Sequence, residues 1–156
     1  MIKTIKVSLK DTPYKVYLGK GVARKIPFYL RNLDLGNFCV IITNQRIHSL
    51  YKTLIKKIIK GYPHIIFKLP DSERAKSKKY MFNIIQELLK QDKLKRKLFI
   101  ICLGGGVIGD VGGFVASIYK RGIPYIQIPT TFLAQIDASI GGKTAIDFGE
   151  VKNIMW

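Results

Sequence analysis

The sequence is poor in acidic residues. Its 156 residues contain 10 aspartates and glutamates against 27 lysines and arginines, which gives a formal net charge of +17. Such a balance permits binding of nucleic acid or of small anions. The densest basic cluster, at 93–97, falls between an expected helix and an expected strand, where solvated charge is normal. The charge therefore permits either kind of partner without indicating one, and we expect a small-molecule partner rather than nucleic acid.

The sequence also has only two cysteines and two histidines. Cys39 and Cys102 lie inside apolar runs, which is typical of buried thiols in strands. His48 and His64 are far apart, and neither stands in an HxxxH, CxxC or HExxH pattern. These residues predict no metal ligands in this chain.

Long apolar runs are missing as well. No run reaches the roughly 18 residues that a membrane helix needs. The N-terminal residues alternate like a strand and lack the apolar core of a signal peptide, so we expect a cytoplasmic protein. A hydrophobic content of 47 % excludes a disordered chain. The length suits a single domain over residues 1–156.

Apolar patterning predicts an α/β fold. Residues 2–9 and 13–19 alternate like two strands with a turn at 11–13, and a short helix over 22–33 contains a disruptive Pro27. Further along the chain, strands are expected over 38–43, 64–69, 98–103 and 124–129, and helices over 46–60, 73–91, 107–118 and from Thr130 or Thr131. Strands that alternate with helices predict a mostly parallel sheet with helices on both faces, preceded by a β-hairpin.

Two of these helices have a clear apolar face. In 46–60 the inward residues are expected to be Ile47, Leu50, Leu54, Ile55 and Ile58, and in 73–91 they are expected to be Met81, Ile84, Ile85, Leu88 and Leu89. Ser72, after Pro70 and Asp71, offers an N-cap for the second helix.

A glycine-rich turn, GGGVIGD at 104–110, follows the buried strand 98–103. It places bare backbone amides at the start of a helix, where the helix dipole favours a phosphate. Gly104, Gly106 and Gly109 match the dinucleotide fingerprint G-x-G-x-x-G, although no acidic residue ends the next strand. Close helix–strand packing is the alternative use of these glycines. It explains the run less well, because each glycine costs chain entropy.

Three further features are polar. Asp110, expected in the first turn of the helix, either complements the dipole or accepts a hydrogen bond from a ribose or nicotinamide group. Thr130 and Thr131 follow a strand and either cap the next helix or bind a ligand at the edge of the sheet. GGKT at 141–144 is no P-loop, because Asp137 stands where that motif needs a glycine.

Four motifs together resemble the nucleotide-binding half of the 3-dehydroquinate synthase family: LPDSERAKS at 69–77, GGGVIGD at 104–110, PTT at 129–131 and AQIDASIGGKT at 134–144. The resemblance implies a Rossmann-like α/β fold and a carbon–oxygen lyase of the shikimate pathway. Members of that family use NAD and a divalent metal, zinc or cobalt, to cyclise 3-deoxy-D-arabino-heptulosonate 7-phosphate to 3-dehydroquinate with loss of phosphate. Another sugar-phosphate cyclase, a dehydrogenase relative and a non-catalytic basic binding module stay open as alternatives.

The resemblance also implies site residues. The NAD-binding positions are Asn44, Asp71, Ser72, Glu73, Arg74, Ala75, Lys76, Gly105, Gly106, Val107, Ile108, Gly109, Asp110, Thr130, Thr131, Leu133, Lys143 and Lys152. The catalytic positions are Arg121, Asp137, Lys143, Lys152 and Asn153, with the lysines supplying charge to the phosphate and carboxylate of a phosphorylated sugar-acid substrate. Arg121 would reach the site of a partner subunit across a homodimer.

The chain departs from the family in two respects. Phe148 and Val151 stand where histidine and glycine are common. The family's metal ligands, one glutamate and two histidines, belong to a helical second domain that these 156 residues do not include. We therefore expect this chain to be an NAD-binding half that is catalytically incomplete by itself.

Overall fold

The computed structural model describes residues 1–9, 13–149 and 151–155. The chain divides into two compact units, Met1–Asp34 and Leu35–Trp156, and each is described by itself.

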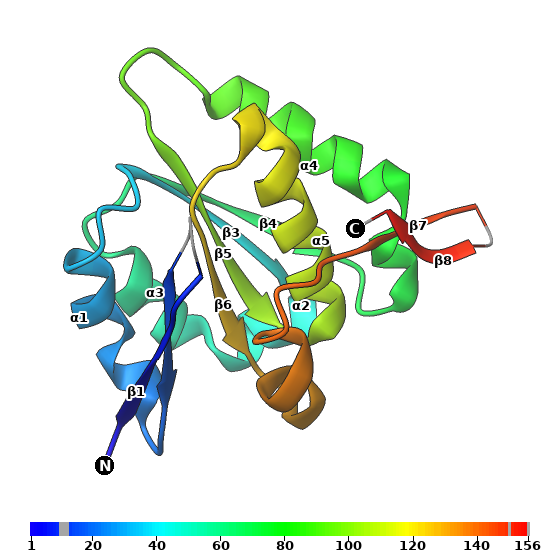
Figure 1. Ribbon diagram of the computed structural model, residues 1–156. Helices are drawn as coiled ribbons and strands as arrows, with labels where there is room; N and C mark the ends of the chain where they lie inside the picture. The colour runs from blue at the N-terminus through cyan, green and yellow to red at the C-terminus, as the bar shows by residue number, and fades with distance from the viewer. Residues whose placement is uncertain (10–12, 150, 156) are drawn as a thin grey trace. The chain divides into compact units, whose positions relative to one another are not determined.

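The first unit is a hairpin followed by a short helix (Figure 1). Strand β1 (Lys3–Val7) pairs antiparallel with β2 (Tyr14–Leu18), which confirms the two predicted strands. Of the predicted turn, residues 11 and 12 lie outside the described residues. The predicted helix over 22–33 is instead a 3-10 turn, η1 (Val22–Lys25), and a helix, α1 (Ile26–Arg31). Pro27 lies in the first turn of α1, where a residue without an amide hydrogen fits.

The second unit contains a parallel sheet with the strand order β4-β3-β5-β6. Its strands are β3 (Phe38–Asn44), β4 (His64–Leu69), β5 (Leu98–Gly104) and β6 (Tyr125–Pro129). Every residue of the two central strands, β3 and β5, is buried, which explains their unbroken apolar sequences. The strands end level with one another, since Asn44 pairs with Leu69 and Gly104 with Pro129. The residues that follow them therefore share one edge of the sheet.

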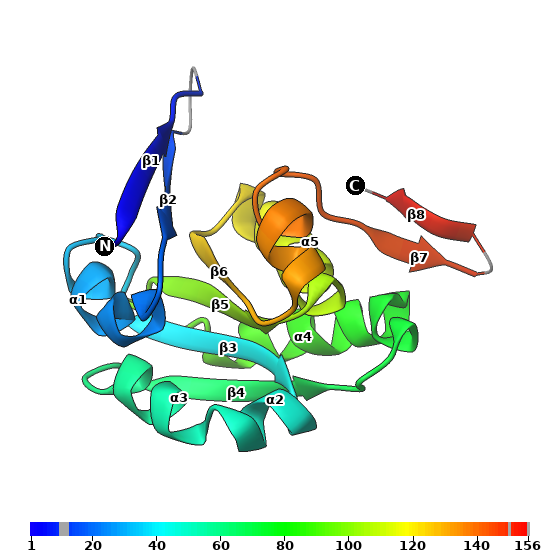
Figure 2. The ribbon, with the colours of Figure 1, turned by 90° about the horizontal axis from the view of Figure 1, so that it is seen from below.

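Helices cover both faces of this sheet, as predicted. Figure 2 shows α2 (Gln45–Leu50) and α3 (Lys52–Ile59) on one face, and α4 (Lys78–Gln91) and α5 (Gly106–Ile118) on the other. The face under α4 and α5 carries an apolar cluster in which Val40, Ile42 and Ile100 pack with Ile84 and Val111. Cys39 and Cys102 are buried free thiols, which confirms their predicted role. Burial raises the pKa of each to about 12.

Two helices predicted as continuous are interrupted. The expected helix over 46–60 breaks at Tyr51, between α2 and α3, and leaves Leu50 68 % exposed while Ile55 and Ile58 are buried. The expected helix over 73–91 begins as a 3-10 turn, η2 (Glu73–Lys76), and breaks at Ser77, whose backbone is extended. Ser77 forms a β-bridge with Asp147, so pairing with a distant segment overrides the local helical tendency. Leu89, expected to face inward, is 61 % exposed.

The remaining elements follow α5. A 3-10 turn, η3 (Tyr119–Arg121), leads to β6, and the next helical segment begins at Phe132 rather than at Thr130 or Thr131. This segment runs into a π-helical turn, η4 (Ala134–Ala138). An antiparallel hairpin that the sequence did not predict comes last, with strands β7 (Ile146–Phe148) and β8 (Val151–Met155). Within the described ranges, no helix has the length and apolar character to cross a membrane.

Candidate functional site

The glycine turn lies between the end of β5 and the start of α5. Gly105 is the N-cap residue of this 13-residue helix, and no described side chain caps it. The first amides of a helix have no partner within the helix, and the dipole adds positive potential at that end. The start of α5 can therefore receive an anion.

The glycines of this turn serve two different purposes. A Cβ on Gly109 would overlap the Gln127 side chain, and one on Gly112 would overlap the Cys102 sulfur. These two glycines let α5 approach the sheet closely, as the packing alternative proposed. A Cβ on Gly106 would meet only ordinary contact, with Ala138 3.7 Å away, so packing does not demand glycine there. A glycine at 106 would instead let a ligand approach the backbone amides closely.

Lys76 is the most buried charged residue beside this turn, at 6 % exposure. Its Nζ lies 2.6 Å from Oδ2 of Asp110 and 3.3 Å from Oε1 of Glu73. Burial by itself lowers the pKa of Lys76, but the hydrogen bond and the charge of Asp110 raise it above its usual value. Asp110 is the fifth residue of α5, so the expectation of a carboxylate in the first helical turn is wrong. Its carboxylate pairs with Lys76 rather than with the helix terminus.

Asn44 connects the end of β3 to the segment 71–76. Its Oδ1 accepts a hydrogen bond from the amide of Ile47 at 2.7 Å and so caps α2, while its Nδ2 donates to Oδ1 of Asp71 at 2.8 Å. The segment is thereby fixed at the carboxyl edge of the sheet. Within it, Ala75 and Lys76 are buried, and Asp71, Ser72, Glu73 and Arg74 are exposed.

Thr130 and Thr131 behave differently. The hydroxyl of Thr131 accepts a hydrogen bond from the amide of Ala134 at 3.3 Å, which is a capping contact. The amide of Thr130 donates to the carbonyl of Gly104 at 2.9 Å, so Thr130 lies beside the glycine turn. Its hydroxyl is buried and has no hydrogen-bond partner in the described part of the chain. A buried hydroxyl without a partner costs about 1–3 kcal/mol, and a polar ligand at this edge would remove that cost.

The structure brings most of the predicted cofactor residues to one edge but separates others. Lys76, Gly105, Asp110 and Thr130 gather around the start of α5, and Asn153 joins them through its side chain, 3.1 Å from Nζ of Lys76. Leu133, Asp137, Lys143 and Lys152 are exposed on the segments that follow β6. Among the described residues, Leu133, Asp137 and Lys152 make no hydrogen bond or ion pair with the Lys76–Asp110 pair.

Arg121 lies at the opposite end of α5. A helix of 13 residues is about 20 Å long, so the start of α5 and Arg121 are on different edges of the sheet. Lys120 and Arg121 both have left-handed backbones, with φ of 51° and 65°. Asp92 accepts hydrogen bonds from the Tyr119 hydroxyl at 2.9 Å and from Nζ of Lys120 at 2.7 Å. These bonds hold the strained turn that presents the exposed Arg121.

Two residues at the edge were not singled out from the sequence. Thr43 is fully buried near the end of β3, and its hydroxyl, like that of Thr130, has no partner among the residues described. The sequence could have pointed to Thr43, because it is a hydroxyl residue inside an apolar run. Asp147 accepts a hydrogen bond from the amide of Asn153 at 2.8 Å. No sequence signal identifies it, because the hairpin that carries it was not predicted.

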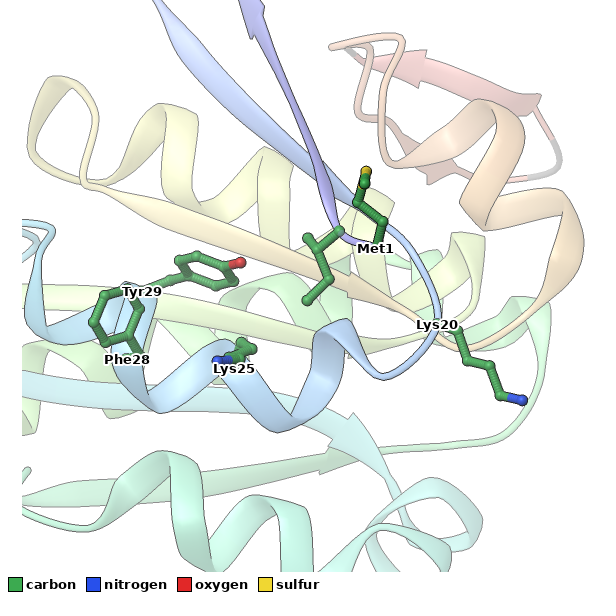
Figure 3. A pocket seen from close by; sticks show the side chains of 6 residues that line it. Met1, Lys20, Lys25, Phe28 and Tyr29 are labelled. Carbon is green, nitrogen blue, oxygen red and sulfur yellow. The ribbon is translucent and has the colours of Figure 1, made fainter.

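A hollow in the first unit offers no comparable chemistry. It is lined by Met1, Ile2, Lys20, Lys25, Phe28 and Tyr29, none of which was predicted as a site residue. In Figure 3 the side chain of Lys20 extends away from Lys25, so the two ammonium groups do not converge on one ligand.

Fold and site define a class: Rossmann-like α/β proteins with a glycine turn at the carboxyl edge of a parallel sheet. Comparison with known proteins identifies the family within that class. Residues 66–155 match the sequence model described as "3-dehydroquinate synthase N-terminal". The chain belongs to the 3-dehydroquinate synthase family.

Curated relatives carry the same name. The chain is 40 % identical over 156 residues to a 3-dehydroquinate synthase of Geobacter metallireducens, covering 99 % of this chain and 43 % of that protein. It is 44 % identical over 155 residues to one of Dictyoglomus thermophilum, covering 99 % of this chain and 41 % of that protein. The chain thus spans about two fifths of the length of these relatives.

Solved structures with this fold include two synthases with bound NAD+. One is 2-deoxy-scyllo-inosose synthase complexed with carbaglucose-6-phosphate, NAD+ and Co2+, with a TM-score of 0.85 and 25 % identity over 98 % of this chain and 42 % of that one. Another is 2-epi-5-epi-valiolone synthase from Streptomyces hygroscopicus with NAD+ and Zn2+, with a TM-score of 0.78 and 28 % identity over 96 % of this chain and 41 % of that one. Maleylacetate reductase from Agrobacterium tumefaciens, at 13 % identity and a TM-score of 0.58, shares the fold.

Proposed function

We propose that this chain is the NAD-binding part of a 3-dehydroquinate synthase that converts 3-deoxy-D-arabino-heptulosonate 7-phosphate to 3-dehydroquinate with loss of phosphate. The observation that carries the proposal is the open, uncapped start of α5 beside the buried Thr130 hydroxyl that lacks a partner. Identities of 40 and 44 % to 3-dehydroquinate synthases, against 25 and 28 % to two cyclases of other products, favour this substrate over theirs.

The residues at the edge suit a dinucleotide. Amides at Gly105, Gly106 and Val107 would hold the pyrophosphate, because they lie at the uncapped, positive end of the α5 dipole. Asp110 and the hydroxyl of Thr130 would bond the ribose and nicotinamide groups nearby. Glu73, exposed on η2, would bond the adenosine side. When bound, NAD supplies the transient oxidation of one substrate hydroxyl and its later reduction.

The exposed charged residues suit the substrate. Lys143 and Lys152 would neutralise its phosphate and carboxylate, and Asp137 and Asn153 would orient it by hydrogen bonds. Arg121 lies about 20 Å from the start of α5, which supports a role in the site of a second copy rather than in its own. This assignment requires a homodimer.

The reaction of the family also requires a divalent metal ion. No three His, Cys, Asp or Glu side chains lie close enough to hold a metal ion within residues 1–9, 13–149 and 151–155. We propose that the zinc or cobalt ion of the family is held by ligands outside these 156 residues. Without those ligands, this chain would bind NAD and would not release phosphate from the substrate.

Calorimetric titration of the chain with NAD+ tests the proposal. We expect saturable binding to one site. Thr130→Val should bind about tenfold more weakly, which corresponds to one lost hydrogen bond, yet should be no less stable because the unpaired hydroxyl is gone. Wild-type protein that is folded by circular dichroism and gives no binding heat up to millimolar NAD+ would refute the proposal.

A further inference from the structure

The hairpin β7–β8 contains an irregularity opposite Asp147. Ile146 pairs with Met155 and Phe148 with Val151, so residues 146–148 of β7 lie opposite the longer stretch 151–155 of β8. The extra residues form a bulge, and within it Asn153 has a left-handed backbone with φ of 52°. Bulges redirect side chains, and asparagine tolerates this conformation better than most residues. Something must nevertheless hold it there.

Asp147 stabilises this backbone conformation of Asn153 with a hydrogen bond. Its Oδ1 accepts the hydrogen bond from the amide of Asn153 at 2.8 Å, the amide that the bulge removes from the ladder. Asp147 is itself fixed from the buried side of the hairpin. Its neighbour Ile146 is fully buried in the core, and Asp147 forms a β-bridge with Ser77, the residue after Lys76.

The bulge directs the Asn153 side chain at Lys76. Oδ1 of Asn153 accepts from Nζ of Lys76 at 3.1 Å, so the three donors of the ammonium group are matched by Asn153, Asp110 and Glu73. Every residue of β8 is exposed, so burial does not hold this strand in place. Two ladder pairs join β8 to β7, and between them the hydrogen bond that Asp147 accepts from the Asn153 amide fixes the position of Asn153.

We propose that Asp147 is a positioning residue of the proposed NAD site: by fixing the amide of Asn153, it anchors β8 to Lys76 and so holds the Asn153 side chain beside the Lys76–Asp110 pair. The inference rests on the proposed function, because the affected property is NAD affinity. Asp147 needs no contact with the cofactor. A change at Asp147 should therefore alter NAD affinity only by displacing Asn153.

A set of five variants tests this dependence by calorimetric titration with NAD+. Asp147→Ala should weaken binding about tenfold, the equivalent of one well-placed hydrogen bond. Asp147→Asn keeps an oxygen acceptor and should bind within about twofold of the wild type. The double variant Asp147→Ala/Asn153→Ala should bind like Asn153→Ala alone. Asp34→Ala, which changes an exposed aspartate of the first unit, is the control and should bind like the wild type.

Three results would overturn the inference. They are wild-type affinity in Asp147→Ala, equal losses in Asp147→Ala and Asp147→Asn, and additive losses in the double variant. Hydrogen exchange at the Asn153 amide separates this inference from the proposed function. The amide should be protected in the wild type and in Asp147→Asn and should lose that protection in Asp147→Ala. If the wild type binds no NAD+, the proposed function fails; if the amide is equally protected in all three proteins, the positioning role fails.

Discussion

The two ends of α5 carry the same ion pair in different surroundings. At the start of the helix, Nζ of Lys76 lies 2.6 Å from Asp110, and the lysine side chain is 8 % exposed. Beyond the other end, Nζ of Lys120 lies 2.6 Å from Asp92, and the lysine side chain is 59 % exposed. Distance does not distinguish the two pairs. The burial of the lysine does, whereas the two carboxylates are alike, with the Asp110 side chain 17 % exposed and the Asp92 side chain 10 % exposed.

The difference is chemical as well as energetic. The buried pair adjoins an uncapped helix start and a buried hydroxyl without a described partner, which together can bind a ligand. The exposed pair braces two left-handed residues, Lys120 and Arg121, and keeps an arginine extended toward solvent. Under the proposed function, the start of α5 would receive the ligand and the other end would present the charge of Arg121. Backbone strain of this kind persists only where surrounding contacts hold it.

The largest expected effect is a loss of NAD+ affinity at the start of α5. Gly105→Val introduces a Cβ 3.1 Å from Cγ2 of Thr131 and places methyl groups beside the open amides, so it should weaken NAD+ binding roughly hundredfold. Isothermal titration calorimetry measures the loss. Ser117→Val, on an exposed position near the other end of α5, is the matched control and should bind normally. Equal affinities in both variants would mean that the cofactor does not use the glycine turn.

The second effect concerns stability. Lys76→Met leaves the carboxylates of Asp110 and Glu73 without their cation and should lower the free energy of unfolding by about 3 kcal/mol. Lys120→Met, at the exposed pair, should cost less than about 1 kcal/mol. Urea denaturation of both variants measures the difference. Similar costs at the two ends would contradict the view that burial separates them.

The smallest expected effect is a pH dependence of stability at the Lys120–Asp92 pair. The hydrogen bond from Lys120 holds the pKa of Asp92 below the usual value of an aspartate. A lowered acid pKa stabilises the fold above the unfolded value, and that contribution disappears as the pH falls through the lower folded pKa. Asp92→Asn should therefore lose part of its stability at pH 6 and flatten the decline below pH 4. Unfolding curves at several pH values check this, and an unchanged acid slope would contradict it.

Much of the fold could be predicted from the sequence. The unbroken apolar runs of β3 and β5 predicted a parallel sheet, because strands covered on both faces have no polar side. Breaks within helices were missed where distant contacts decide. Ser77 leaves the helix because it pairs with Asp147, 70 positions further along the chain, and no local pattern records that pairing.

The site was predictable to a different degree. The glycine turn indicated an anion site, but alone it was a weak signal, because close packing also requires glycine at some of these positions, such as Gly104 beside Ile108. Arg121 and Asn153 were assigned through the family resemblance alone, and their roles stay predictions. Asp147 could not be found, because its contribution depends on one backbone amide in a left-handed bulge. Residue type carries no signal for such a contact.

The central claim is that NAD binds at the start of α5 and not at its other end. Nuclear magnetic resonance of the ¹⁵N-labelled chain during titration with NAD+ tests it most directly. The account predicts that the largest shifts occur at the amides of Gly105 to Asp110, with further shifts at Lys76 and Thr130, and that Lys120 to Gly122 do not respond. Shifts confined to Lys120–Gly122, or no shifts at any amide of a folded chain, would contradict it.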